Sequence, residues 1–426
     1  MVERVVVAPD KFKGSLSATD VTTRVAAGLT AAGFGGDIVP VPVADGGDGT
    51  VDAAVSAGYR RVDLAVPGPV GNPVTASFAL LDGTAVIEAA QACGLTLLPF
   101  GEFAPLTATS RGVGDLILAA SRLGAKQIVL GVGGVATTDG GAGLVRALGA
   151  RLLDDDGRHL PEGGAALNRL AELDLAGLRD LSGVEFWLAS DVDNPLLGAH
   201  GAASVYGPQK GASGDDVRLL EAGLARWADV AEAAVAIRRG GFGGQHGSGR
   251  QHGSPGQDGS VRPGGSGEQP GSDWRNGSDR QDGRPKRSLT ADEPGAGAAG
   301  GLGFAALLFL GARMRPGIEL LLELASFSER LDGTRLVITG EGSLDAQTLH
   351  GKAPVGVARA AAAHQPPVPV VAVAGRCTLS PDELRAVGIS AAYALTDIEP
   401  DVIQCMTNAG PLVERLTERI AADWLR

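Results

Sequence analysis

The chain has 426 residues, of which 44% are hydrophobic and only 4% aromatic, and its formal net charge is −12. This length is enough for two or three domains with separate cores, and the composition is typical of an α/β enzyme. The acidic balance argues against general binding to nucleic acid or to anionic membranes, so an anionic substrate must be attracted by local positive groups.

Cysteine usage and apolar runs indicate the compartment. Cys93, Cys377 and Cys405 show no C-x-x-C spacing, which favours reduced thiols and no zinc site. The first ten residues have too short an apolar core for a secretory leader, and residues 301–312 are too few to cross a bilayer. We therefore expect a cytoplasmic protein.

The first apolar run, residues 5–8, predicts a buried strand that ends in Asp10, Lys11 and Lys13. A helical pattern follows. Two lysines and an acid therefore lie at the carboxyl end of a strand, which is where open parallel sheets bind ligands.

Residues 38–43 repeat this order of a strand, an acidic glycine-containing loop and a helix. The loop carries Asp45 and Asp48, and the helix covers residues 51–55. An acid beside glycine is ordinary turn chemistry, but its recurrence at a second strand end favours a functional interpretation.

The periodicity changes from residue 61. Alternating apolar residues and turn signals predict antiparallel strands over 62–66, 74–78 and 84–88, so a second domain begins near here. Later in this domain a strand over 186–190 ends in an acidic turn, and a glycine-flanked lysine precedes a helix that runs to about residue 237. The polar residues of these two segments are Asp191, Asp193, Asn194 and Lys210.

A glycine-rich loop over residues 131–143 joins a strand to a helix and is shaped to hold an anion. Glycines let the backbone approach a ligand closely, and the free N–H groups of the following helix point positive charge at it. One carboxylate among hydroxyls suits a phosphate with a bridging Mg²⁺. The candidate residues are Gly133, Gly134, Thr137, Thr138, Asp139, Gly140 and Gly141.

Other interpretations of this loop remain open. It lacks the Gly-Lys-Ser/Thr ending of a P-loop. Gly131, Gly133 and Ala136 match the dinucleotide fingerprint, with acids at 154–156 in the range of a ribose contact. A tight strand-to-helix turn in which Asp139 caps the helix is the structural alternative.

Residues 238–293 contain mostly Gly, Ser, Gln, Arg and Asp, and we expect a disordered low-complexity insert because such a segment buries little apolar surface. Its Arg-Gly-Gly start faintly suggests an RNA-binding tract, but a neutral loop insertion is the favoured interpretation.

Strand-like runs return after the insert, over residues 336–340, 368–374 and 391–395, and the first of them leads into Glu341 and Asp345. With the first two strands they make about five parallel strands. The predicted fold is α/β with two domains. A Rossmann-like parallel-sheet domain (1–66 and 294–426) is split in sequence by an inserted mixed α/β domain (67–237) that carries the Gly-rich loop.

Lysine is scarce, with six residues in the chain, and four of the six lie in glycine-bearing, turn-like motifs. A compact ammonium is a good phosphate binder, so these four are functional candidates: Lys11, Lys13, Lys210 and Lys352.

Seven motifs, in order along nearly the whole chain, make the sequence similar to the type 1 family of bacterial glycerate kinases. They are 7–15 (VAPDKFKGS), 42–49 (PVADGGDG), 133–141 (GGVATTDGG), 191–196 (DVDNPL), 207–211 (GPQKG), 294–301 (PGAGAAGG) and 339–345 (TGEGSLD). The resemblance implies a two-domain α/β protein that phosphorylates D-glycerate with ATP, usually at the 2-hydroxyl, in an interdomain cleft. The insert departs from the family pattern, and Lys11 stands where many members carry serine, which makes Lys13 the better candidate for an essential cation.

Phosphoryl transfer needs metal-bridged phosphates, cations on the transferring oxygens and a carboxylate near the acceptor hydroxyl. We expect Asp139 and its neighbouring glycines to serve the ATP phosphates and Mg²⁺, with Asp191 as a second metal candidate. Lys13 and Lys210 are expected to meet phosphate or the substrate carboxylate, and Asp191 or Asp193 to orient or deprotonate the hydroxyl. Further expected substrate contacts are Asp10, Lys11, Asp45, Asp48, Asn194, Glu341 and Asp345.

Three alternatives stay open: a kinase for another small hydroxy acid, an NAD(P)-dependent dehydrogenase that uses the Gly131 fingerprint, and a noncatalytic ligand sensor. In each case we expect a small-molecule ligand, no nucleic-acid or membrane partner, and a monomer or homodimer. The phosphorylated oxygen, O2 or O3, is open at this point.

Overall fold

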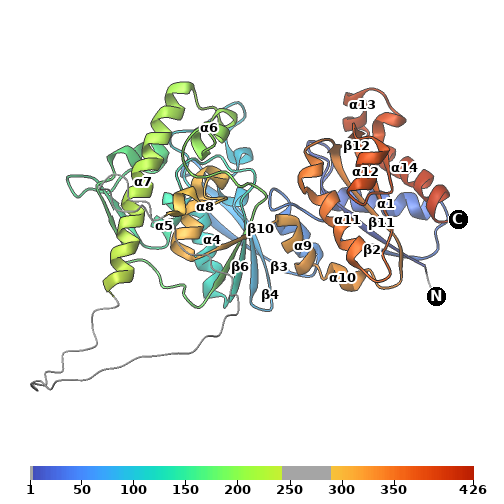
Figure 1. Ribbon diagram of the computed structural model, residues 1–426, viewed down its shortest axis with the longest axis horizontal. Coiled ribbons are helices and arrows are strands. Elements are labelled where there is room, and N and C mark those ends of the chain that lie inside the picture. Colours follow the sequence, from blue (N-terminus) through green and yellow to red (C-terminus); the bar gives the residue numbers. More distant parts are fainter. Residues whose placement is uncertain (1–2, 242–288) are drawn as a thin grey trace, which may run out of the picture.

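The computed structural model describes residues 3–241 and 289–426, which form two α/β bodies lying side by side (Figure 1). One body contains a five-stranded sheet and the other a six-stranded sheet. Both chain ends lie in the five-stranded body (Figure 1), so the chain leaves this body, builds the other one and returns. The predicted α/β fold, with a mixed domain inserted into a Rossmann-like domain, is confirmed.

The five-stranded sheet is parallel throughout, as the sequence predicts. Val5 and Val7 face one core while Val6 and Ala8 face another, so the first strand is apolar on both sides and buried on both sides. In spatial order the strands are β13 (Ala391–Ala394), β12 (Val370–Cys377), β11 (Thr334–Leu344), β1 (Arg4–Pro9) and β2 (Asp37–Pro40).

Helices cover both faces of this sheet. One face packs against α1 (Ala18–Ala31) and α14 (Ala409–Trp424). Residues from four helices pack on the other face: α9 (Gly317–Leu324), α10 (Phe327–Arg330), α11 (Ala353–Ala363) and α12 (Pro381–Ala386). The short helix α13 (Val402–Thr407) precedes α14.

The six-stranded sheet is mixed. Its first four strands in spatial order are parallel, and the last two are added in antiparallel hairpins as the alternating pattern predicts. The order is β10 (Arg313–Arg315), β9 (Glu185–Ala189), β6 (Gln127–Gly131), β5 (Thr84–Glu88), β4 (Pro73–Leu81) and β3 (Arg60–Pro67). A separate ribbon pairs β7 (Arg151–Leu153) with β8 (Glu172–Asp174).

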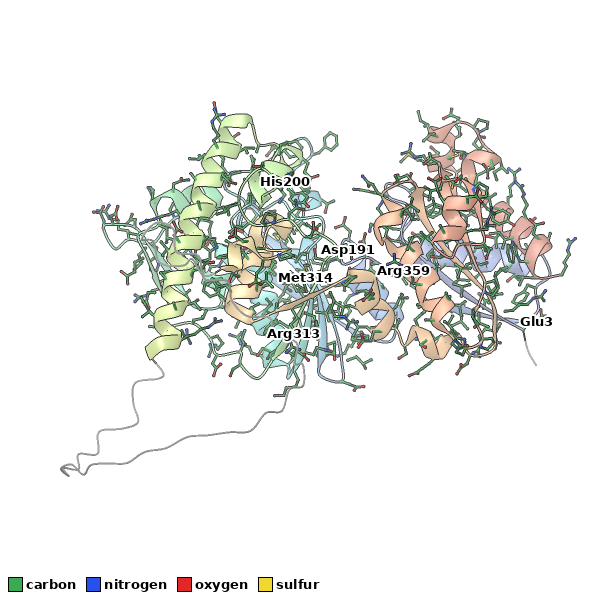
Figure 2. All side chains as sticks on the ribbon, viewed as in Figure 1. Glu3, Asp191, His200, Arg313, Met314 and Arg359 are labelled. Carbon is green, nitrogen blue, oxygen red and sulfur yellow. The ribbon has the colours of Figure 1, made fainter. Side chains whose placement is uncertain are left out.

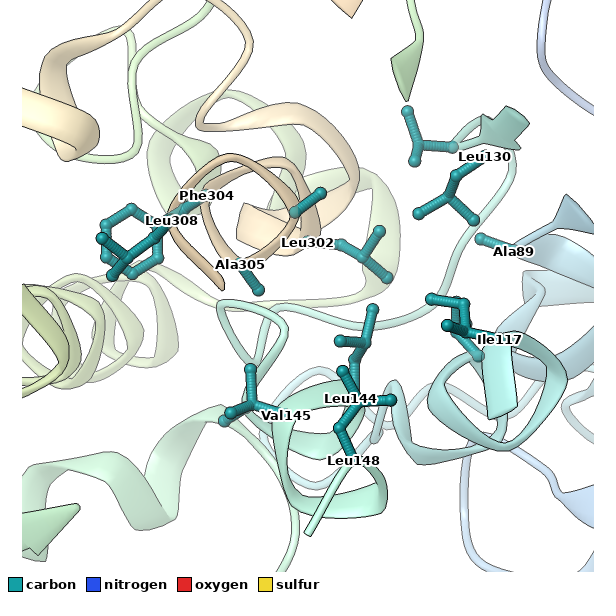
Figure 3. Packing of buried hydrophobic residues seen from close by; sticks show 14 of the residues in the cluster. Ala89, Ile117, Leu130, Leu144, Val145, Leu148, Leu302, Phe304, Ala305 and Leu308 are labelled. Atoms are coloured by element: carbon teal, nitrogen blue, oxygen red, sulfur yellow. The ribbon is translucent and has the colours of Figure 1, made fainter. Parts of the chain in front are cut away.

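One face of the mixed sheet carries the larger core. In Figure 3, Leu144 of α5 and Leu148, which follows α5, lie beneath Leu302 and Ala305 of α8, and all four belong to one buried cluster. The helices on this face are α3 (Ala90–Cys93), α4 (Arg111–Arg122), α5 (Ala142–Ala147), α6 (Ala202–Tyr206), α7 (Gly214–Gly241) and α8 (Ala298–Leu310).

The opposite face of the mixed sheet packs against α2 (Thr50–Ser56) and α9, which lies between the two bodies in Figure 1. Within α9, Leu320 and Leu321 pack on the mixed sheet, while Ile318 and Leu322 belong to the core of the parallel sheet. One helix therefore contributes to the cores of both bodies and fixes the position of one sheet relative to the other.

The expected domain boundaries differ from the sheets at two places. Strand β3 begins at Arg60, before the expected boundary at 66/67, because it forms a hairpin with β4. After the insert, α8 and β10 still belong to the mixed body, since α8 is apolar all round and β10 pairs with β9. We propose that the division between domains follows the two sheets, with the return to the parallel body at α9.

The expected low-complexity insert falls mostly outside the described residues, which omit 242–288. At its edges, residues 238–241 continue α7, and Leu289–Asp292 form a 3-10 turn. Among the described residues, no helix has the length and apolarity needed to span a membrane.

Candidate functional site

A cavity of about 660 Å³ opens at the carboxyl ends of β1, β11 and β12. The sequence motifs at these strand ends fold into one place, because the carboxyl ends of parallel strands share one edge of a sheet. The cavity collects many of the predicted site residues: Asp10, Lys11, Lys13, Asp45, Asp48, Gly133, Gly134, Glu341 and Asp345.

Asp10 and Lys11 form a charged pair in this cavity. Lys11 Nζ lies 3.6 Å from Asp10 Oδ1 and donates a hydrogen bond of 2.8 Å to the carbonyl oxygen of Asp48. Burial raises the pKa of the Asp10 carboxyl to about 6, although the Lys11 ammonium opposes this shift. Lys11 thus ties the first strand end to the loop that carries Asp48.

Glu341 is 7% exposed and is held by two neighbours. It accepts a hydrogen bond from the Thr348 hydroxyl, and Lys352 Nζ lies 3.6 Å from its Oε2. Burial raises the pKa of the Glu341 carboxyl, against the effect of Thr348 and Lys352. The Glu341 side chain therefore fixes the position of Lys352 at the cavity wall.

Lys352, a functional candidate from sequence without an assigned role, also lines the cavity. Several other lining residues were not predicted: Ser15, Ser343, Gln347, Gly375, Arg376 and Thr396, with the apolar Phe12, Leu395, Val402, Cys405 and Met406. The signal for Lys352 was its place in a glycine-bearing turn. Arg376 follows Gly375 at a predicted strand end, and its Nε donates a hydrogen bond of 2.9 Å to Ser343 Oγ. The apolar residues on α13 carried no such signal.

A smaller cavity of about 170 Å³ adjoins the first, and Asp45 and Gly133 line both. Asp191 lines it too and lies between the two bodies in Figure 2, near Arg359 of the parallel-sheet body, with which it lines a further cavity. Partial burial raises the pKa of the Asp191 carboxyl to about 6, and the negative charges of Asp45 and Glu319 add to the shift. A proton-accepting group with a pKa near neutrality therefore stands beside a small cavity.

Glycines let the loops from the two sheets meet at this junction. Gly133 N donates to the carbonyl oxygen of Gly46 at 3.2 Å, and a Cβ on Gly133 would lie 2.5 Å from Gly47 Cα. A Cβ on Gly131 would lie 2.5 Å from the Gly46 carbonyl oxygen, so this first glycine of the dinucleotide fingerprint packs against protein backbone.

Asp139 lies in the interior, outside the lining of both cavities. It is 1% exposed and accepts hydrogen bonds from Ser110 N and Oγ, both at 2.8 Å, and from the N–H groups of Gly141 and Gly143. Burial raises the pKa of its carboxyl, while these hydrogen bonds oppose the shift. Asp139 thus holds the start of α5, as in the helix-capping alternative, and its predicted contact with Mg²⁺ or phosphate stays a prediction.

Lys210 is also interior, with 3% exposure. Its Nζ donates a hydrogen bond of 2.6 Å to the carbonyl oxygen of Thr137, and burial lowers the pKa of its ammonium to about 8. Nearby, Trp227 Nε1 donates to the carbonyl oxygen of Gly140 at 2.9 Å. Unlike Gly133 and Gly134, the second half of the Gly-rich loop is inside the protein: Thr137, Thr138, Asp139, Gly140 and Gly141.

Asp193 and Asn194 follow Asp191 but lie outside the lining of both cavities. Asn194 Nδ2 donates to the carbonyl oxygen of His200 at 2.8 Å, and its Oδ1 accepts from the Tyr206 hydroxyl at 2.6 Å. Asn194 therefore closes the turn that follows β9, and of the polar residues Asp191, Asp193 and Asn194 only Asp191 lines the small cavity.

The described residues contain no group of three or more His, Cys, Asp and Glu side chains that could hold a metal ion by themselves. Mg²⁺ seldom uses such a cage; it takes one or two carboxylates and completes its shell with substrate phosphates and water. Asp10, Asp45 and Asp48 line the large cavity beside the lysines. These carboxylates fit an ion that arrives with a polyphosphate.

The sequence and the structure are both similar to known proteins. The model of the glycerate kinase family matches residues 5–254 and 278–425. The glycerate kinase of Bacillus subtilis (strain 168) is 39% identical over 424 residues, which cover 99% of this chain and 97% of the relative. The glycerate 2-kinase of Escherichia coli (strain K12) is 37% identical over 423 residues, with 98% and 97% covered.

A solved structure is similar over the same extent. The crystal structure of a protein provisionally named glycerate kinase 2, from Salmonella typhimurium LT2, superposes with a TM-score of 0.75. It is 35% identical in sequence, and the match covers 99% of this chain and 98% of that one. Relatives of this identity over nearly the full length, together with the family model, confirm the predicted family and enzyme class: the chain belongs to the glycerate kinase family, whose members are phosphotransferases.

Proposed function

We propose that this protein transfers the γ-phosphoryl group of ATP to D-glycerate, with Mg²⁺ on the phosphates, and that 2-phosphoglycerate is the favoured product. It acts in the cytoplasm on a small molecule, without a nucleic-acid or membrane partner, as a monomer or homodimer. Family membership and the strand-end cavities support this proposal.

One observation carries the proposal: a large cavity and a small one share Asp45 and Gly133. The large one has the volume of a ligand pocket and lysines for a polyphosphate, whereas the small one suits a three-carbon hydroxy acid. A nucleotide in the first and glycerate in the second would meet at the shared residues. Such a meeting point holds a donor phosphorus and an acceptor oxygen at reacting distance.

In the proposed step the glycerate hydroxyl loses its proton to the Asp191 carboxylate while its oxygen attacks the γ-phosphorus. The bond from that phosphorus to the β,γ-bridging oxygen breaks, and ADP leaves with the electron pair. Asp191 suits this role because a pKa of about 6 leaves it deprotonated at neutral pH yet basic enough to accept a proton. Asp193, the other predicted base, lies outside the small cavity.

Cations at the cavity wall would stabilise the transferring phosphoryl oxygens. Lys11, Lys13, Lys352 and Arg376 line the large cavity, and Lys13, Lys352 and Arg376 are the cations proposed to meet these oxygens. Mg²⁺ would be held by carboxylates among Asp10, Asp45 and Asp48 and by phosphate oxygens of the nucleotide. Bound there, it would neutralise charge on the β- and γ-phosphate oxygens.

The sequence analysis expects Lys210 to contact phosphate or the substrate carboxylate, but the proposal gives it another role. It is a positioning residue, because its ammonium holds the Thr137 carbonyl and thus the path of the Gly-rich loop behind Gly133 and Gly134. Direct contact with phosphate would require Lys210 to leave its buried site.

The test is ADP release by the purified protein with ATP and Mg²⁺, with and without D-glycerate. The proposal predicts release that depends on D-glycerate, whereas faster turnover with another hydroxy acid would move the assignment to that acid. Saturable binding without ADP release would support a ligand sensor, and an NAD(P)H signal with glycerate would support a dehydrogenase.

A further inference from the structure

The large cavity has one apolar wall, which the proposed transfer step does not use. Val402 and Met406, four residues apart on α13, line the cavity and are 52% and 47% exposed. Residues at this spacing lie on the same side of a helix. Behind them, Leu395 and Cys405 also line the cavity and are 1% and 4% exposed, so they form a buried apolar floor.

The charged groups of the same cavity are cationic and acidic side chains at and near the strand ends. Its cations are Lys11, Lys13, Lys352 and Arg376. Met406 lies against the loop that carries Lys13, since its Cε lies 3.1 Å from where a Cβ on Gly14 would be. One cavity therefore offers an apolar patch and cations to a single ligand. A ligand that matches both has a flat apolar end and a polyanionic end.

We propose that the side of α13 formed by Val402 and Met406 binds the base of the nucleotide donor and so sets the affinity for ATP. This inference rests on the proposed function, because it places the donor of that reaction. The phosphates would then run from α13 along the cations toward Asp45 and Gly133, which the large cavity shares with the small one.

The chemistry of the two side chains fits a base. Half-exposed apolar side chains at a cavity wall lose water contact when a flat ring covers them, and this burial is favourable. Methionine is polarizable and adapts its shape to an aromatic ring. Since the cavity volume of about 660 Å³ lies in the range of small-molecule sites, a nucleotide fits the space better than a protein segment does.

The test compares two probes and two variants by calorimetric titration in the presence of Mg²⁺. ATP carries the base, and inorganic tripolyphosphate carries only the anionic part. The double variant Val402→Thr with Met406→Gln keeps side-chain size but removes apolar contact. The control variant Ile403→Gln changes the same helix at a residue that is 72% exposed and outside the cavity lining.

We expect the double variant to raise the Kd for ATP about tenfold and to leave the Kd for tripolyphosphate within about twofold, since only the base contact is lost. Ile403→Gln should change neither value. Because the substituted side chains are half-exposed, both variants should unfold at nearly the wild-type temperature, and Val402→Thr alone serves if the double variant does not fold.

Each contrary outcome leads to a different conclusion. ATP affinity that is unchanged in the double variant overturns the inference while the proposed kinase function stands, and a concurrent change in oligomeric state would assign the apolar patch to a second copy of the chain. Equal weakening of ATP and tripolyphosphate also overturns it, because the loss would then not concern the base. A wild-type protein that binds no ATP would overturn the proposed function and this inference together.

Discussion

Lys210 donates a 2.6 Å hydrogen bond from Nζ to the carbonyl oxygen of Thr137, and both residues are buried. The bond joins the turn before α7 to the Gly-rich loop, whose first half faces the cavities. Burial of an ammonium costs desolvation, and the hydrogen bond to the Thr137 carbonyl oxygen compensates part of that cost.

Replacing the Lys210 side chain should therefore lower both the stability of the fold and the catalytic rate. Lys210→Ala leaves a cavity and an unpaired carbonyl oxygen, so we expect the free energy of unfolding to fall by about 2–4 kcal/mol. The kcat/KM for D-glycerate should fall as well, because the loop behind Gly133 loses its support. Denaturant unfolding and steady-state kinetics measure the two effects, with Lys126→Ala, an exposed lysine on the same body, as the control. A variant with wild-type stability would contradict the positioning role.

Glu88 makes stability depend on pH. Its carboxylate accepts hydrogen bonds from the N–H groups of Gly49 and Val51 at the start of α2, and burial raises its pKa from 4.5 to about 7. The folded state therefore binds more protons than the unfolded state between pH 4.5 and 7. The stabilisation due to this proton is complete below pH 4.5 and is lost as the pH rises through 7.

The neutral variant Glu88→Gln should expose this dependence. Relative to wild type, its free energy of unfolding should increase by roughly 2–3 kcal/mol between pH 4.5 and pH 8. Urea unfolding at several pH values measures the difference, and the exposed Glu102→Gln should show none. A difference that is constant with pH would show that Glu88 titrates alike in the folded and unfolded states.

Substitutions of Asp191 and Asp193 should have clearly different effects on kcat. Asp191→Asn removes the proposed base and should lower kcat about 10²- to 10⁴-fold. Asp193→Asn, which changes a residue outside the small cavity, should stay within about tenfold of wild type because it removes no group near the hydroxyl. The reverse order of the two effects would move the role of the base to Asp193.

The pH profile of the wild-type enzyme gives an independent test of the base. Because the pKa of Asp191 is about 6, its carboxylate is protonated below that pH and accepts no proton from the substrate. We expect kcat/KM for D-glycerate to fall about tenfold per pH unit below 6, and more steeply where Asp10, also near 6, must be charged. A rate that is flat from pH 7 to pH 5 would exclude a titrating carboxylate.

The sequence predicted the strands of the parallel sheet well because each is a short apolar run followed by a polar, glycine-containing loop. Asp10, Asp45 and Glu341 could be brought together in advance from the rule that parallel strands share an edge. The domain boundaries were harder to predict than the strands. The apolar helix α8 packs on the mixed sheet, and its sequence alone gives no signal of which sheet it covers.

The sequence also could not predict which residues of the Gly-rich loop are buried and which line a cavity. Gly133 and Asp139 belong to one motif, yet the first lines both cavities and the second is enclosed by N–H donors. An aspartate that caps a helix and one that binds Mg²⁺ have the same neighbours in sequence, so only the fold separates them. Likewise, nothing in the sequence separates Val402 and Met406 from ordinary surface residues, and only the fold shows that they line the cavity.

The most direct test of the account is the ³¹P NMR spectrum of the product formed from ATP, Mg²⁺ and D-glycerate. Transfer to the 2-hydroxyl places the phosphate on a carbon that bears one hydrogen, so the proton-coupled phosphomonoester signal should be a doublet. A triplet would show transfer to the CH₂ oxygen and contradict the favoured product. The absence of any new phosphomonoester beside unchanged ATP would contradict the proposed kinase function itself.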